Sequence, residues 1–234
     1  QRLLSAIVDK SPPMDAVTDD KHGHPTYLGL EPRDLSFVRA ILMAALRYRG
    51  DLEAVIDGLV ERPLPDGALS LRAILHVAGA QIFFLDVPTH SAVDLAVESA
   101  NRDPRNRRFA PLVNAVTRRM VREKDKHLEA FSSMPQNAPN WFFDRLKRVY
   151  GLETAIQIFE LHRHPAPIDI TLKEPFDEVA NGLLEGRHGQ RISASNVRLT
   201  GKIDVTQLPG FDDGHWWVQD YAASIPARLF VGVA

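Results

Sequence analysis

The sequence predicts a mainly α-helical protein in which a helical bundle is followed by a small α+β unit. Apolar residues recur with the helical period through most of residues 1–125. The composition turns polar and proline-containing around residues 123–139, and beyond this stretch a strand-like alternation appears. We therefore expect domains at residues 1–128 and 139–214, with a further segment at residues 215–234.

Composition narrows the class of protein. The chain has 234 residues, of which 44% are hydrophobic and 25% charged, as in soluble globular proteins. Its net charge of -2 favours neither nucleic acid nor membrane, although an overall balance can hide a local patch. It contains no cysteine, which excludes disulfides, Cys-ligated metals and a thiol nucleophile. No stretch has the roughly 18 consecutive apolar residues of a membrane span. The start, at Gln1, has no signal-peptide pattern, so we expect a trimmed terminus and a cytoplasmic protein.

The helices expected in the first domain carry apolar stripes at i, i+3, i+4 and i+7. Residues 11–34 are the exception, because prolines and glycines punctuate a polar loop there. Asp51 is placed as an N-cap, and Pro63 follows the helix that it would begin. Such helices must bury their stripes against one another, which predicts a compact bundle. The stripes span residues 52–59, 71–85, 93–100 and 109–120.

The second part of the chain mixes helices and strands. Pro139 is expected to open a helix that ends at Gly151, with a second helix after it. Strands are expected at residues 167–172, 197–199 and 216–218, a short helix at residues 175–184, and the start of another helix at residues 222–230. On the last strand one of Trp216 and Trp217 should face the core and the other the opposite side, where it would stack on a base or cover another domain.

The strongest local feature is basic. Nine Lys/Arg stand against three acids between Asn101 and Lys126. Arginine is a favoured phosphate ligand because its planar group binds two oxygens at once. Two interpretations stay open: an RNA-binding surface, or a solvated helix face paired with acids elsewhere. The candidate RNA-binding residues are Arg102, Arg105, Arg107, Arg108, Arg118, Arg119 and Arg122.

Motifs for catalysis, cofactors and metals are missing from the sequence. It has no Gly-rich phosphate loop and no G-x-S-x-G nucleophile turn. The histidine pairs His22/His24 and His162/His164 have no obvious third ligand, so a metal site and a metal-dependent hydrolase are disfavoured. We therefore expect no catalytic, cofactor-binding or metal-binding residue in this chain.

Two stretches resemble known families. Residues 79–85 (GAQIFFL), 88–98 (PTHSAVDLAVE) and 112–119 (LVNAVTRR) resemble the NusB-type RNA-binding helical domain. Residues 208–211 (LPGF) and 214–223 (GHWWVQDYAA) resemble the segment that precedes the catalytic core in the Fmu/RsmB group of ribosomal-RNA cytosine-5 methyltransferases. That group joins a NusB-like domain, an RRM-like α+β module and a Rossmann-type S-adenosylmethionine domain, in the order that the elements above would follow.

The resemblance implies a recognition role for this chain. In the family the cofactor loop and two catalytic cysteines come later, so residues 215–234 would be the lead-in to an absent methyltransferase domain. We expect S-adenosylmethionine to be the cofactor of the longer parent alone, and ribosomal RNA and that domain to be the partners, with no membrane and no metal. The resemblance also favours RNA contact by the arginines, and it makes Asn114 an inter-helix hydrogen-bonding residue.

One alternative of another class remains. An antitermination NusB module binds RNA together with a ribosomal protein. Such a free-standing domain should end near Lys126 and should lack the WWVQD segment at residues 216–220.

Overall fold

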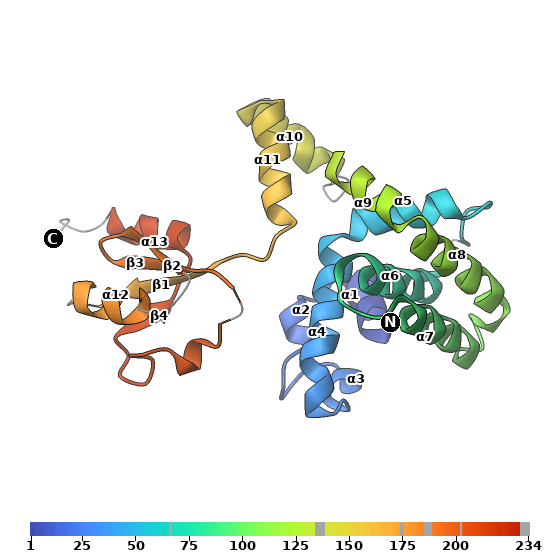
Figure 1. Ribbon diagram of the computed structural model, residues 1–234, viewed down its shortest axis with the longest axis horizontal. Helices are drawn as coiled ribbons and strands as arrows, with labels where there is room; N and C mark the ends of the chain where they lie inside the picture. The colour runs from blue at the N-terminus through green and yellow to red at the C-terminus, as the bar shows by residue number, and fades with distance from the viewer. Residues whose placement is uncertain (66, 134–138, 174–175, 185–188, 202, 230–234) are drawn as a thin grey trace. The chain divides into compact units, whose positions relative to one another are not determined.

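The computed structural model divides into two compact units, residues 1–164 and 165–234 (Figure 1). Each unit has its own hydrophobic core. The first unit is helical and the second contains a small sheet, as the sequence predicts. The structure describes residues 1–65, 67–133, 139–173, 176–184, 189–201 and 203–229.

The first unit is made of helices of very different length. Four of them supply most of the core: α4, α5, α6 and α8. Its elements are α1 (Arg2–Lys10), α2 (Met14–Val17), α3 (Pro25–Leu28), α4 (Pro32–Arg47), α5 (Arg49–Leu59), α6 (Leu69–Phe84), α7 (Thr89–Arg102), the 3-10 turn η1 (Arg107–Phe109), α8 (Ala110–Arg122), α9 (Lys124–Ser133), α10 (Asn140–Tyr150) and α11 (Leu152–His162).

Helix α6 is the centre of this unit. Its buried residues lie on every side of the helix, which is the pattern of a helix surrounded by protein. It packs against α1, α4, α5, α7, α8 and α9, several of which surround it in Figure 1. At Gly79 a Cβ atom would lie 2.7 Å from Leu52 Cδ2, so the missing side chain lets α5 and α6 approach closely. The two helices therefore meet at a glycine contact.

Two local expectations need correction. The loop expected at residues 11–34 contains the single-turn helices α2 and α3 and the start of α4. Asp51 is not the N-cap of α5, because the helix begins two residues earlier, at Arg49, after Tyr48. Asp51 instead lies buried in the first turn, where its Oδ2 accepts a hydrogen bond from Arg163 Nη2 at 3.1 Å. A buried carboxylate of this kind is stable only with such a partner.

The end of α11 is tied to the bundle around that contact. Arg163 Nη1 also donates to Phe131 O, and Tyr48 Oη donates to Arg163 O at 2.7 Å. These bonds join α11 to α5 and α9, which explains why the helical unit extends to residue 164. The sequence places the boundary earlier, at residues 129–138, because the polar composition there resembles a linker. Residues 134–138 themselves lie outside the described part of the chain.

The second unit is an antiparallel sheet with helices. Its strands have the order β2-β3-β1-β4, with β1 paired to both β3 and β4. Its core contains Ile170 and Leu172 of β1, and Trp216 is 4% exposed whereas Trp217 is 44% exposed, as strand alternation predicts. The elements are β1 (Ile168–Leu172), α12 (Phe176–Leu184), β2 (Gly189–Ser193), β3 (Asn196–Leu199), the 3-10 turn η2 (Val205–Gln207), β4 (Trp216–Val218) and α13 (Tyr221–Arg228).

This sheet includes one strand, β2, that the sequence pattern does not predict. Strand β2 reads GQRIS and has no exposed-buried alternation, because it lies at the sheet edge with most of its residues in solvent. Strand β4, in turn, belongs to the sheet, whereas the resemblance to the methyltransferase group predicts a separate lead-in segment at residues 215–234.

Candidate nucleic-acid interface

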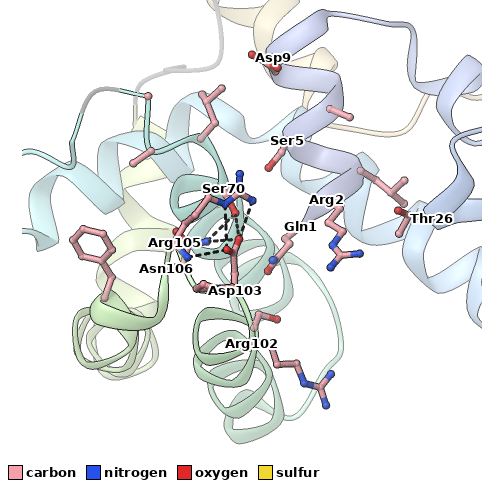
Figure 2. Close-up of a pocket in the computed structure, with 18 of the residues that line it drawn as sticks. Gln1, Arg2, Ser5, Asp9, Thr26, Ser70, Arg102, Asp103, Arg105 and Asn106 are labelled. Atoms are coloured by element: carbon pink, nitrogen blue, oxygen red, sulfur yellow. Dashed lines mark hydrogen bonds and ion pairs between the residues drawn. The ribbon is translucent and has the colours of Figure 1, made fainter.

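The loop between α7 and α8 is organised by one carboxylate, Asp103. Its oxygens accept hydrogen bonds from the Arg105 side chain at 3.0 and 3.2 Å, from Ser70 Oγ at 3.2 Å and from Asn106 Nδ2 at 3.1 Å (Figure 2). Arg105 donates hydrogen bonds to Asp103 from its side chain and from its backbone N–H. These bonds, chiefly those from the side chain, hold the pKa of Asp103 at about 2, well below its usual range. Asn106, which is buried, also donates to Ser70 Oγ at 2.8 Å. The loop is therefore fixed to the start of α6 by its own polar residues.

An open groove of about 1180 Å³ lies between this loop and α1. It is larger than most small-molecule pockets, which suits an extended ligand. Five basic and two acidic side chains line it, so its charge favours an anion. In Figure 2, Arg2 on α1 and Arg102 on α7 appear on the groove together with the Asp103 network. The basic residues are Arg2, Lys10, Arg102, Arg105 and Arg108, and the acidic ones Asp9 and Asp103.

Four of the seven candidate arginines are paired with carboxylates. Arg102 contacts Glu98 at 2.6 Å, and Arg105 contacts Asp103. Arg122 contacts Glu123 at 3.5 Å. Arg119 contacts Glu123 at 3.3 Å and also donates to Leu59 O at 3.2 Å, at the end of α5. Arg119 therefore also stabilises the contact between α8 and the end of α5.

The other three, Arg107, Arg108 and Arg118, are exposed and have no carboxylate within ion-pair distance among the described residues. Arg107 donates to Asn101 O at 3.1 Å, and the Arg108 guanidinium lies 4.7 Å from the Phe109 ring centre. Arg118 Nε donates to Asn114 Oδ1 at 2.9 Å. Each guanidinium is thus held by a neutral group and keeps its charge available for an anion.

The seven arginines do not form one compact cluster. Arg102, Arg105, Arg107 and Arg108 lie before α8, whereas the other three lie on its last two turns. The rise of an α-helix puts about 15 Å between Arg108 and Arg118. The seven arginines thus extend along the surface rather than around one point, and the groove lies at the end that holds Arg102, Arg105 and Arg108.

Some residues of this surface escape sequence reasoning. Arg2 and Lys10 share the groove with Arg102, although about a hundred residues separate them along the chain, and no local pattern could join them. Asn114 differs from its expected role, because it is only half-buried and its partner, Arg118, lies on the same helix. A carboxamide one turn before an arginine is a recognisable i, i+4 pair, so this contact had a signal in the sequence.

Other candidate sites in the described residues are structural. No group of three or more His, Asp or Glu side chains there comes together as a metal site. His24 Nδ1 accepts a hydrogen bond from Thr26 N and caps α3, and His164 lies 3.7 Å from Glu160. Burial lowers the pKa of His76 to about 4, and its ring nitrogens lie beside Arg72 O and Glu53. Across the described residues, no helix combines the length and the apolar character that a bilayer span requires.

On the face of the second unit's sheet away from its core, the described strand residues are polar except for Trp217 of β4. RRM modules stack bases on aromatic side chains of their sheet. Here Asp169 is buried and accepts two hydrogen bonds from Arg198, at 2.7 and 2.8 Å, and a third from Tyr221 N. The Arg198 guanidinium holds the pKa of Asp169 below its usual value. The exposed Trp217 at the edge strand donates to Gln219 Oε1 at 3.1 Å.

The helical unit matches a known family. Residues 5–122, which is half of the chain, match the model of the NusB family. The chain belongs to the NusB family. The matched range contains α4–α8 and all seven candidate arginines.

Relatives of this NusB-family chain extend the likeness beyond the matched range. It is similar to ribosomal RNA small subunit methyltransferase B of Xanthomonas campestris, with 34% identity over 82% of this chain and 44% of the relative. The protein of the same name from Pasteurella multocida is 27% identical over 97% of this chain and 51% of the relative. The resemblance to the Fmu/RsmB group is thereby confirmed, and the chain spans about half the length of these relatives.

A solved structure supports the fold alone. The crystal structure of PH0851 aligns with a TM-score of 0.54 and 17% identity, over 97% of this chain and 54% of that one.

Proposed function

We propose that this chain is the RNA-binding, substrate-recognition part of an S-adenosylmethionine-dependent ribosomal-RNA cytosine-5 methyltransferase. The observation that carries the proposal is the extent of the match. Similarity to proteins named ribosomal RNA small subunit methyltransferase B covers 97% of the chain, including the sheet unit that a free-standing NusB domain would not need.

The methyl transfer itself would require residues that this sequence does not contain. A thiolate adds readily to C6 of cytosine, which makes C5 nucleophilic toward a methyl donor. The sequence has no cysteine. The proposed role is therefore to bind RNA, with the cofactor and the catalytic thiols supplied by a methyltransferase domain.

The seven arginines are the proposed RNA contacts, but their contributions should differ. Binding a phosphate with Arg102, Arg105, Arg119 or Arg122 would compete with an ion pair already present. Arg107, Arg108 and Arg118 would bind phosphate without breaking such a pair. These three should therefore contribute most of the affinity and of its dependence on salt.

This assignment predicts the behaviour of a triple variant, Arg107→Gln, Arg108→Gln and Arg118→Gln. Its affinity for a small-subunit ribosomal-RNA fragment should fall about tenfold to a hundredfold at low salt. The slope of log K against log salt should become shallower by about two, because each lost phosphate contact removes roughly 0.7–0.9 from it. Fluorescence anisotropy across a salt series measures both quantities.

A matched control removes the same charge elsewhere. Lys21, Arg33 and Arg62 are exposed and lie outside the proposed surface, so replacing all three with Gln should change the affinity less than threefold. Equal losses of affinity in the two triple variants would show that binding depends only on net charge, and this result would overturn the arginine assignment. A wild-type chain with no affinity for the RNA would overturn the proposed function itself.

A further inference from the structure

Helix α10 exposes an aromatic and basic stripe that lies outside the range matched by the NusB family model. Trp141 is 68% exposed, which is high for so large an apolar side chain. Arg145 and Arg148 follow at i+4 and i+7, on the same side of the helix, and both are exposed. The opposite side packs inward, where Phe142 and Phe143 lie 5.6 and 5.5 Å from the Phe159 ring of α11. Packing of the hairpin therefore does not use the stripe.

Helix α10 is also basic. Within the described residues, no carboxylate forms an ion pair with Arg145 or Arg148. The helix also carries Lys147 and a single acid, Asp144, so cations outnumber acids three to one. Along the helix axis, the backbone positions of Arg145 and Arg148 lie about 6 and 10 Å from that of Trp141. A flat apolar ring followed by two available cations matches the chemistry of a base with its flanking phosphates.

We propose that this stripe, Trp141, Arg145 and Arg148, is a second RNA-binding site, which takes an unpaired segment of the RNA. Trp141 stacks on an exposed base, and the two arginines bind the phosphates beside it. The inference rests on the proposed function, because it assumes that the chain binds RNA, but it uses none of the seven arginines assigned above. In this proposal α10 binds unpaired RNA, and the arginines along α8 bind phosphates at a separate site.

The surroundings of Trp141 favour RNA over a protein partner. A protein-binding helix face groups apolar residues around its aromatic anchor. On this stripe Trp141 is followed by Arg145 and Arg148, and its one ring contact among the described residues is with the adjacent Phe142, at 5.5 Å. The other exposed apolar residues of the hairpin lie off this stripe. Val149 and Tyr150 are about 80° and 180° around α10 from Trp141, and Leu152, Ile156 and Leu161 are on α11. An exposed ring followed by two cations on one side of a helix is the pattern of a base-stacking site.

The test uses the 234-residue chain and two probes, a short single-stranded ribosomal-RNA fragment and the same sequence as a blunt duplex. Trp141→Ala should weaken single-strand binding about tenfold, since one stacked base contributes that order of affinity. Trp141→Phe should keep most of the binding, because a ring remains. Both variants should bind the duplex as the wild type does. Arg145→Gln with Arg148→Gln should weaken single-strand binding and make its salt dependence shallower by about 1.4, since each phosphate contact to a single strand contributes roughly 0.7.

Matched controls are available on the same hairpin. Leu161→Ala removes an equally exposed apolar side chain from α11, and Lys147→Gln removes one charge from α10 on another side of the helix. Both should leave the affinity within twofold. If Trp141→Ala binds the single strand as tightly as wild type, or weakens both probes equally, the stacking site is overturned and a protein contact becomes the explanation of the exposed ring. The proposed function survives that result as long as the Arg107, Arg108 and Arg118 variant still loses affinity.

Discussion

Asp103 determines which arginines of the α7–α8 loop are available to an anion. It pairs with Arg105 and leaves Arg107 and Arg108 without a carboxylate among the described residues. An arginine used to hold a loop is rarely also a strong phosphate ligand, since one guanidinium would have to serve two anions. The basic run in the sequence thus contains two kinds of residue, those that shape the surface and those that are exposed on it.

The depressed pKa of Asp103 predicts a pH dependence of stability. A carboxyl whose folded-state pKa is about 2 stabilises the fold above its unfolded value, near 3.8, and this contribution is lost as the pH falls toward 2. Because the loop is open to solvent, we expect a loss on the order of 1 kcal/mol, below what the full shift would imply. Denaturant unfolding of wild type and Asp103→Asn between pH 2 and 6 measures it. The variant should lack this component, and parallel curves would contradict the assignment.

At the scale of single residues, the sequence predicts only those arginine contacts that lie within one helix. Spacing indicates that Arg102 can reach Glu98 and that Arg119 can reach Glu123, because both are i, i+4 pairs. It does not show that Arg119 also bonds to Leu59 O, sixty residues away. Nor does it show Arg2 beside the groove. Such contacts depend on the packing of whole helices.

At the scale of elements, the buried pair Asp51–Arg163 ties α11 to the bundle. Both side chains are almost fully buried, so removal of Arg163 takes away the ion pair of a buried carboxylate, whereas removal of Asp51 leaves Arg163 with Glu160 at 3.6 Å. Arg163→Ala should destabilise the helical unit by roughly 3 kcal/mol, in the range seen for broken buried pairs. The double variant Asp51→Ala with Arg163→Ala should cost less than the sum of the two single changes. Additive losses in denaturant unfolding would show that the two residues act independently.

The elements themselves were largely predictable, and the exceptions have physical causes. Helices with an apolar stripe, such as α6 and α8, lie within a few residues of their expected bounds. Asp51 resembles an N-cap in sequence, but a buried arginine far along the chain binds its carboxylate instead. Strand β2 was missed because an edge strand with most of its residues in solvent needs no apolar alternation.

At the scale of the whole molecule, the near-neutral net charge conceals two basic surfaces. The run from Arg102 to Arg122 was visible in the sequence as a charge cluster. The stripe on α10 was not, because its three residues are dispersed among Phe142, Phe143 and Leu146, and only the structure shows which side of the helix is exposed. A total charge of -2 therefore says little about what the molecule binds.

The two hydrophobic cores have no residue in common, which predicts that a core substitution acts on its own unit. Leu71 on α6 and Leu199 on β3 are each fully buried, one in each core. Truncation of either to Ala leaves a cavity and should cost roughly 2–5 kcal/mol. Hydrogen exchange followed by mass spectrometry locates the loss. Leu71→Ala should raise exchange in the peptides of α6, α7 and α8, and Leu199→Ala in those of β1 and β3. Loss of protection in both units from one substitution would mean that they unfold as a single cooperative body.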